Sequence, residues 1–257
     1  MNQTPPPDFY TDPAPQPAQP IPIQVDWKLP ARIPWVTYIM MGLCVLVYLI
    51  QIATNNLLGY DLPMLLGAKI NEAIIAGEYW RLFTPMWLHG SLMHILFNMY
   101  ALYYFGRGLE QHYGHERFIW LYLISGFAGN VVSFLFTDAA SVGASTVIFG
   151  LAAAQMVFIY QNRTLFGPRG RAMLMNTLMI VGINLLIGLT PGIDNWGHVG
   201  GLMGGLAFAW LGGPLWVTTR DAYKIQVRDG RPVSQARLVG ILVFMVFVVV
   251  AAIKILH

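Results

Sequence analysis

The sequence is poor in charged residues. Only 11% of its 257 residues are Asp, Glu, Lys or Arg, whereas an ordinary soluble domain has about 25%. Hydrophobic residues make up 56%, and they form seven runs close to the roughly 20 residues that cross a hydrocarbon core. The runs lack the polar face of a soluble helix, so we predict an all-α, polytopic membrane protein. They cover residues 35–54, 91–109, 118–137, 146–162, 172–190, 197–213 and 238–256.

The sequence also lacks several chemical motifs. Cys44 is the single cysteine and lies in an apolar run, so we expect no internal disulfide and an inert thiol. There is no H-E-x-x-H zinc motif, no Gly-x-Gly-Asp aspartyl motif, and no nucleotide or redox cofactor motif. We therefore expect neither a cofactor nor a metal.

No secretory leader is apparent, because residues 1–34 have neither a basic start nor an apolar core. They hold ten of the sixteen prolines, and such a polar segment buries too little surface to fold. We predict a disordered cytoplasmic tail, or alternatively a ligand for a proline-recognising partner. The remaining chain is predicted to comprise a six-helix core (35–213), a basic cytoplasmic linker (214–237) and a seventh transmembrane helix (238–257).

Basic residues fall mostly on one side of the predicted membrane. With a cytoplasmic N-terminus, twelve of the fifteen lie on the cytoplasmic side, and only Lys69, Arg81 and Lys254 lie opposite. This bias predicts the orientation of a multi-pass protein, which we expect in the cell (plasma) membrane. The net charge of +3 then reflects loops beside anionic lipid and does not indicate nucleic-acid binding. The second, fourth and sixth runs all begin on the outer side.

Two of these runs begin at residues that a lipid-facing helix does not need, Ser145 and His198. A serine hydroxyl becomes a nucleophile when a nearby base takes its proton, and histidine is the side chain poised for that role near neutrality. The outer acids Asp138 and Asp194 lie in predicted loops, which favours a Ser–His dyad without a third member. Taken singly, a membrane serine or histidine more often closes an interhelical hydrogen bond.

Further polar residues lie near the start of the second run. His94 and Asn98 are four residues apart and share one helical face, and asparagine is a common oxyanion donor. His89 precedes His94 by five residues and is predicted in the preceding loop. The first-turn N–H groups at Ser145 lack helical partners and would also stabilise an oxyanion.

Glycines recur at spacing four in the sixth run, at Gly197, Gly201 and Gly205. Small residues at this spacing let two helix backbones approach closely. Packing of this face against the fourth run near Gly150 would bring His198 to Ser145.

Taken in order, these motifs resemble the rhomboid family of intramembrane serine proteases over residues 35–213. The matching segments are Gly77-Glu78-Tyr79-Trp80-Arg81, the run from His89 to Met99, Gly-x-Ser at Gly143 and Ser145, and His-x-x-Gly at His198 and Gly201. The resemblance implies a rhomboid-like bundle of six transmembrane helices, here with an added C-terminal helix. It also implies cleavage of single-pass transmembrane substrates beside a small residue.

The resemblance implies roles for individual residues. Ser145 would be the nucleophile and His198 the general base, with Asn98, His94 and the Ser145 N–H forming the oxyanion hole. Phe149 matches an aromatic position that packs on the catalytic imidazole. Trp80 and Arg81 match a first loop that braces the site.

Two positions depart from the family pattern. Thr146 replaces the glycine that usually follows the serine, and Gly197 replaces the alanine that commonly precedes the histidine. Neither change removes a reacting group, although Thr146 adds bulk where activity or selectivity would change. Two other functions compete with a protease: a catalytically silent rhomboid-like protein that binds membrane clients, and a small transporter or channel. The latter predicts mid-membrane charges or an internal repeat, and the sequence has neither.

Overall fold

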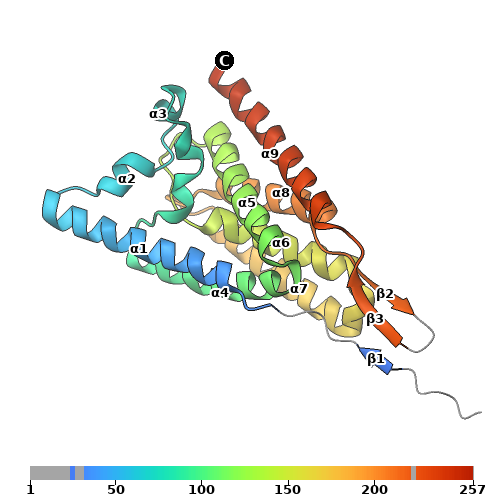
Figure 1. Cartoon of the computed structure of the whole chain (residues 1–257). Coiled ribbons are helices and arrows are strands. Elements are labelled where there is room, and N and C mark those ends of the chain that lie inside the picture. The colour runs from blue at the N-terminus through green and yellow to red at the C-terminus, as the bar shows by residue number, and fades with distance from the viewer. Residues whose placement is uncertain (1–23, 27–31, 221–223, 257) are drawn as a thin grey trace, which may run out of the picture.

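The structure is a computed structural model that describes residues 24–26, 32–220 and 224–256. Its seven long helices coincide with the seven predicted spans and confirm the all-α membrane fold class (Figure 1). The predicted starts of the fifth and the seventh run were too late, because those helices begin at Arg163 and Val233. The long helices are α1 (Trp35–Leu58), α4 (Leu92–Tyr113), α5 (His115–Phe136), α6 (Ser145–Gln161), α7 (Arg163–Ile187), α8 (Asn195–Gly212) and α9 (Val233–Leu256).

The segment between α1 and α4 folds into short helices that the sequence analysis did not predict. Arg81 holds this segment together, since its guanidinium donates to the carbonyls of Leu65 and Ala68, both at 2.9 Å. The Trp80 indole donates to the Leu66 carbonyl at 3.0 Å. The short elements are α2 (Leu62–Gly67), α3 (Asn71–Ile75) and the 3-10 turns η1 (Tyr79–Leu82) and η2 (Thr84–Trp87).

Helix α5 is the centre of the bundle and packs against α8, α6, α9 and α4. Most of its residues are buried, whereas α1, α7 and α9 expose most of their apolar surface. These four helices are long and apolar enough to cross a membrane. Helix α6 has 17 residues, and α4 and α8 contain polar residues or glycines that make them less apolar.

A buried carboxylate joins the starts of α1 and α5. Glu110, near the end of α4, accepts hydrogen bonds from the N–H groups of Val36 (2.9 Å) and Thr37 (2.7 Å). It thereby caps α1, whose first-turn N–H groups have no helical partner. His115 also contacts Glu110, at 2.7 Å. Gly114 has φ of +76°, which glycine adopts without strain, and the chain turns there directly from α4 into α5.

The interval 214–237, predicted as a linker, contains two strands and the first turn of α9, which corrects its predicted boundaries. Strand β2 (Trp216–Arg220) pairs antiparallel with β3 (Lys224–Asp229). Strand β1 (Gln24–Asp26) lies within the predicted tail and pairs parallel with β3, so disorder is not observed there. Strand formation fits the β-branched residues of this hairpin. Residues 1–23 and 27–31 of the tail lie outside the described residues.

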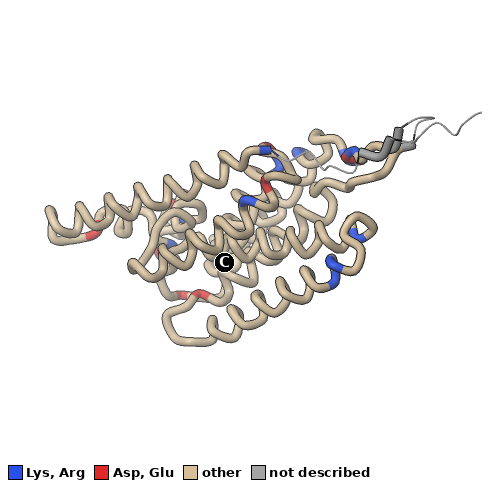
Figure 2. The backbone as a smooth tube through the Cα atoms, turned by 90° about the horizontal axis from the view of Figure 1, so that it is seen from below, with Lys and Arg blue, Asp and Glu red and all other residues tan. Residues whose placement is uncertain are grey.

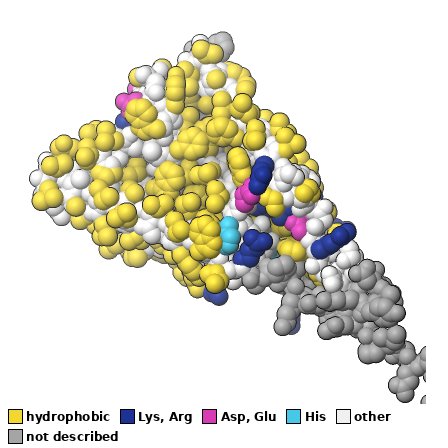
Figure 3. All heavy atoms as spheres, in the orientation of Figure 1, with side chains coloured by type: hydrophobic (Ala, Val, Ile, Leu, Met, Phe, Trp, Pro, Cys, Tyr) yellow, Lys and Arg dark blue, Asp and Glu magenta, His cyan; other side chains and the backbone are white. Residues whose placement is uncertain are grey.

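Charged and apolar side chains are segregated along the bundle. Figure 2 shows most described Lys and Arg residues toward the end that carries the strands, as the predicted topology requires. Figure 3 shows hydrophobic side chains over most of the visible helical body, with most of the visible charges beside the strand end. Of the predicted outer basic residues, Lys69 and Arg81 are buried in loop contacts.

Candidate active site

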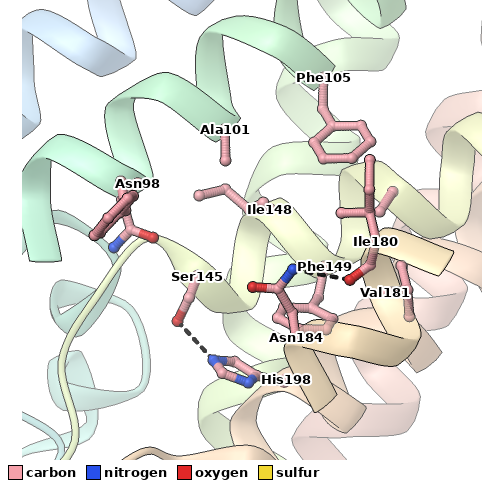
Figure 4. Close-up of a pocket in the computed structure, with 12 residues that line it drawn as sticks. Asn98, Ala101, Phe105, Ser145, Ile148, Phe149, Ile180, Val181, Asn184 and His198 are labelled. Carbon is pink, nitrogen blue, oxygen red and sulfur yellow. Dashed lines mark hydrogen bonds between the residues drawn. The ribbon is translucent and has the colours of Figure 1, made fainter. Parts of the chain in front are cut away.

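Ser145 and His198 lie next to each other at the end of the bundle opposite the strands. Ser145 opens α6 and His198 lies in the first turn of α8. The Nε2 atom of His198 is 3.0 Å from the Ser145 Oγ atom, a hydrogen bond drawn in Figure 4. The histidine is 7% exposed. This distance suits proton transfer between a nucleophile and a base.

The two helices approach at the level of their backbones, as the glycine spacing predicted. A Cβ atom on Gly201 would lie 2.0 Å from the Thr146 carbonyl oxygen, and one on Gly205 would lie 2.2 Å from the Gly150 oxygen. Both distances are impossible for real atoms, so only glycine permits this packing. The close contact carries His198 to Ser145.

Phe149 fixes the plane of the imidazole. Its ring stacks on that of His198, with centroids 4.2 Å apart and planes 13° apart. The His198 Nδ1 atom is buried and has no hydrogen-bond partner among the described residues. Asp138 and Asp194 make no hydrogen bond to the ring, so the arrangement is a dyad.

Asn98 and His94 face the turn that precedes Ser145. A Cβ atom on Gly143 would lie 2.7 Å from His94 Nε2 and 3.5 Å from Asn98 Nδ2. Gly143 also has φ of +133°, which only glycine adopts readily. The Asn98 Nδ2 atom is buried without a partner in the described part of the chain. An unused buried donor beside the Ser145 hydroxyl could stabilise negative charge that develops there.

Two cavities meet at the dyad. A pocket of about 140 Å³ between α4, α6 and α7 is lined by Ile180 and Asn184 as well as by the dyad (Figure 4). A larger cavity of about 680 Å³ includes His94, Ser141 and Asp194 and opens between the loops at this end of the bundle. The dyad is therefore reached both from the helix side and from the loop side.

Three predicted supporting residues do not touch the dyad. Trp80 and Arg81 brace the loop between α1 and α4 through the contacts described above. His89 is 1% exposed, and its backbone N–H and carbonyl pair with the Gln51 amide at 3.1 Å each. Burial lowers the pKa of His89 to about 4, and neighbouring His94 acts in the same direction. The His89 ring is therefore neutral near pH 7. It packs edge-on against the His94 ring, with the two ring centroids 5.2 Å apart.

The two cavities are also lined by residues that the sequence did not place at the site, among them Ile180 and Asn184 in the smaller pocket, and Ser141 and Asp194 in the larger one. Asp194 was assigned to a loop, but it is the N-cap of α8. The signal was present in the sequence, since an aspartate directly before a helix start is a common cap. Within the described ranges, no three His, Cys, Asp or Glu side chains are grouped to hold a metal ion.

A sequence model of the Rhomboid domain matches residues 76–215, which include every residue of this site. The chain belongs to the rhomboid family. It is 38% identical over 183 residues to rhomboid protease GluP of Bacillus subtilis (strain 168), covering 70% of this chain and 36% of that protein. It is 44% identical over 135 residues to RHOMBOID-like protein 7 of Arabidopsis thaliana, covering 52% of this chain and 43% of that protein.

A third rhomboid relative, RHOMBOID-like protein 6, mitochondrial, of Arabidopsis thaliana, is 41% identical over 148 residues, which are 57% of this chain and 48% of that protein. The chain thus spans between about a third and a half of the length of these relatives. Membership in the rhomboid family and the apolar helices identify an integral membrane protein.

Proposed function

We propose that this rhomboid is an intramembrane serine endopeptidase with Ser145 as nucleophile and His198 as general base. The observation that carries the proposal is the 3.0 Å contact between Ser145 Oγ and His198 Nε2. The Ser145 oxygen attacks the peptide carbonyl carbon while the imidazole takes its proton. The imidazolium then protonates the leaving amine, and the same base activates a water that hydrolyses the acyl-enzyme.

The oxyanion of the tetrahedral intermediate is stabilised by the backbone N–H of Ser145, the Asn98 amide and the His94 ring. The unpartnered Asn98 Nδ2 atom supports this role, because no competing hydrogen bond must break first. The first turn of α6 adds the positive end of a helix dipole. Each of these groups is in place before substrate arrives.

The substrates are single-pass transmembrane proteins. A helical substrate hides its carbonyls in hydrogen bonds, so it unwinds locally before attack. The pocket of about 140 Å³ accepts the side chain beside the cleaved bond, and its size favours a small residue. Water enters from the larger cavity on the loop side. The cytoplasmic N-terminus inferred from the charge bias puts this cavity outside the cell membrane.

A second function is a silent rhomboid-like protein that binds membrane clients. It predicts no turnover despite client binding. The presence of Ser145, His198, Asn98 and His94 in one partly buried arrangement favours the protease.

The test is cleavage of a purified single-span reporter by the full chain in detergent and in liposomes. We expect cleavage by the wild type and none by Ser145→Ala or His198→Ala. A fluorophosphonate, which reacts with activated serines, should label the wild type at Ser145 and leave both variants unlabelled. Cleavage that survives Ser145→Ala would refute the dyad, whereas reporter binding without cleavage would favour the client binder.

A further inference from the structure

We propose that Asp194 is a positioning residue that ties the segment before Ser145 to the helix that carries His198. The proposal rests on the proposed protease function and deepens it. Asp194 touches neither Ser145 nor the His198 ring. Its two carboxylate oxygens instead bind one group on each side of the dyad.

One oxygen belongs to the His198 side. Asp194 Oδ1 accepts the N–H of Gly197 at 2.9 Å, and the Asp194 carbonyl accepts the N–H of His198 at 3.2 Å. The carboxylate thus caps the first turn of α8 and fixes where that turn begins. A shift of this turn moves the imidazole with it.

The other oxygen belongs to the Ser145 side. Asp194 Oδ2 accepts the Ser141 hydroxyl at 2.5 Å, a short bond of the charge-assisted kind. Ser141 is 8% exposed and lies four residues before Ser145. This hydrogen bond therefore connects the approach to α6 with the cap of α8.

The Ser141 segment is also fastened to the rest of the protein. Ser141 pairs with Lys69 through both backbone groups, at 3.0 and 3.1 Å. The Lys69 ammonium donates to the Thr137 carbonyl at 2.6 Å. The Gly143 N–H donates to the Pro85 carbonyl at 2.9 Å. The loop between α1 and α4 holds the Ser141 segment in place. The hydrogen bond from Ser141 to Asp194 therefore fixes the start of α8 relative to that loop.

Gly197 makes room for this link. A Cβ atom on Gly197 would lie 2.6 Å from Asp194 Oδ2, the oxygen that binds Ser141. Since a carboxylate rotates easily, an alanine at 197 would turn it away from Ser141. Gly197, in place of the alanine common in the family, therefore leaves room for the hydrogen bond between Ser141 and Asp194.

The test compares variants of the full-length protein in one detergent. Asp194→Ala removes both hydrogen bonds, and we expect kcat to fall about 10- to 100-fold, as for a displacement of about 1 Å, with little change in KM. Asp194→Asn retains an acceptor for Gly197 and gains a donor for Ser141, so it should restore most of kcat. Ser141→Ala and Gly197→Ala break only the link between the two sides and should lower kcat about two- to tenfold.

Asp138→Ala is the matched control, because it removes a nearby outer carboxylate that binds Asn71 and not Ser141. It should leave kcat unchanged. Combining Ser141→Ala with Asp194→Ala should cause no loss beyond that of Asp194→Ala, because Ser141 acts through Asp194. If Asp194→Asn loses as much kcat as Asp194→Ala, the charge of Asp194 and not its hydrogen bonds sets kcat, and the proposal is overturned. Wild-type kcat in Asp194→Ala would overturn it outright.

Hydrogen–deuterium exchange gives a readout that needs no turnover. Asp194→Ala and Gly197→Ala should raise exchange in both residues 138–145 and residues 195–199, whereas Asp138→Ala should leave residues 195–199 unchanged. Unchanged exchange in both segments of the Asp194→Ala and Gly197→Ala variants refutes the link. A wild type that exchanges as expected but neither cleaves the reporter nor labels at Ser145 refutes the protease function and not the link. If Asp194→Ala does not fold, Ser141→Ala and Gly197→Ala decide the outcome.

Discussion

Phe149 stacks face to face on His198, with ring centroids 4.2 Å apart. Such an aromatic pair contributes about 0.5–1.5 kcal/mol, which corresponds to about 2- to 13-fold in a rate that depends on the orientation of the ring. We expect Phe149→Leu to lower kcat within that range and Phe149→Tyr to retain it. Phe158→Leu, further along the same helix, is the control and should retain kcat. Equal kcat in Phe149→Leu and wild type would show that the stacking does not orient the base.

Much of this arrangement follows from the sequence. The spans, the shared end of α4, α6 and α8, and the glycine contact were predicted because hydropathy, charge bias and glycine spacing are local signals. The short helices between α1 and α4 were not, since they depend on distant groups such as Arg81. The same holds for the link between Ser141 and Asp194. The hairpin of β2 and β3 was not predicted for another reason. Its basic composition indicated a linker, and this outweighed the β-branched residues that favour strands.

Gly201 tolerates no side chain. Its Cβ atom would overlap the Thr146 carbonyl oxygen at 2.0 Å, and overpacking of this kind costs about 1–3 kcal/mol or more. We expect Gly201→Ala to lower the thermal unfolding midpoint and to abolish cleavage. Gly182→Ala in α7, where a Cβ atom would meet nothing within 4 Å, should do neither. An active Gly201→Ala enzyme with an unchanged midpoint would contradict the backbone contact.

Thr146 carries a hydroxyl that is buried without a hydrogen-bond partner in the described part of the chain. A buried, unpaired hydroxyl costs about 1–3 kcal/mol. Replacement by valine keeps the shape and removes that cost, so Thr146→Val should raise the midpoint of thermal unfolding. Thr146→Gly should lower it, because it empties space beside Gly129 and Gly197. A lower midpoint for Thr146→Val would mean that the hydroxyl is paired in solution.

Glu110 should be required for stability and not for chemistry. Glu110→Ala leaves the buried N–H groups of Val36 and Thr37 without an acceptor, at a cost of about 1–3 kcal/mol. We expect a lower unfolding midpoint and an unchanged kcat for the protein that remains folded. Glu116→Ala removes an exposed carboxylate that pairs with Arg237 and should not shift the midpoint measurably.

His89 should make stability depend on pH. Its pKa is about 4 in the folded protein and 6.5 as the ordinary value, so the unfolded state binds more protons between these limits. The free energy of unfolding therefore falls as the pH drops from about 6.5 to about 4, by up to about 3 kcal/mol from this residue. Denaturation of wild type and His89→Gln at pH 7 and pH 5 measures the difference. If both lose stability equally, His89 does not contribute.

At Gly201 and Gly205, helix α8 contacts the main-chain atoms of α6 directly. Side-chain packing elsewhere in the bundle freezes rotamers, and that lost entropy opposes association. At these two glycines there are no rotamers to freeze, so the helices that carry Ser145 and His198 meet without that entropic cost. At these two glycines no alternative side-chain arrangement exists, so main-chain geometry sets how closely the two helix backbones approach.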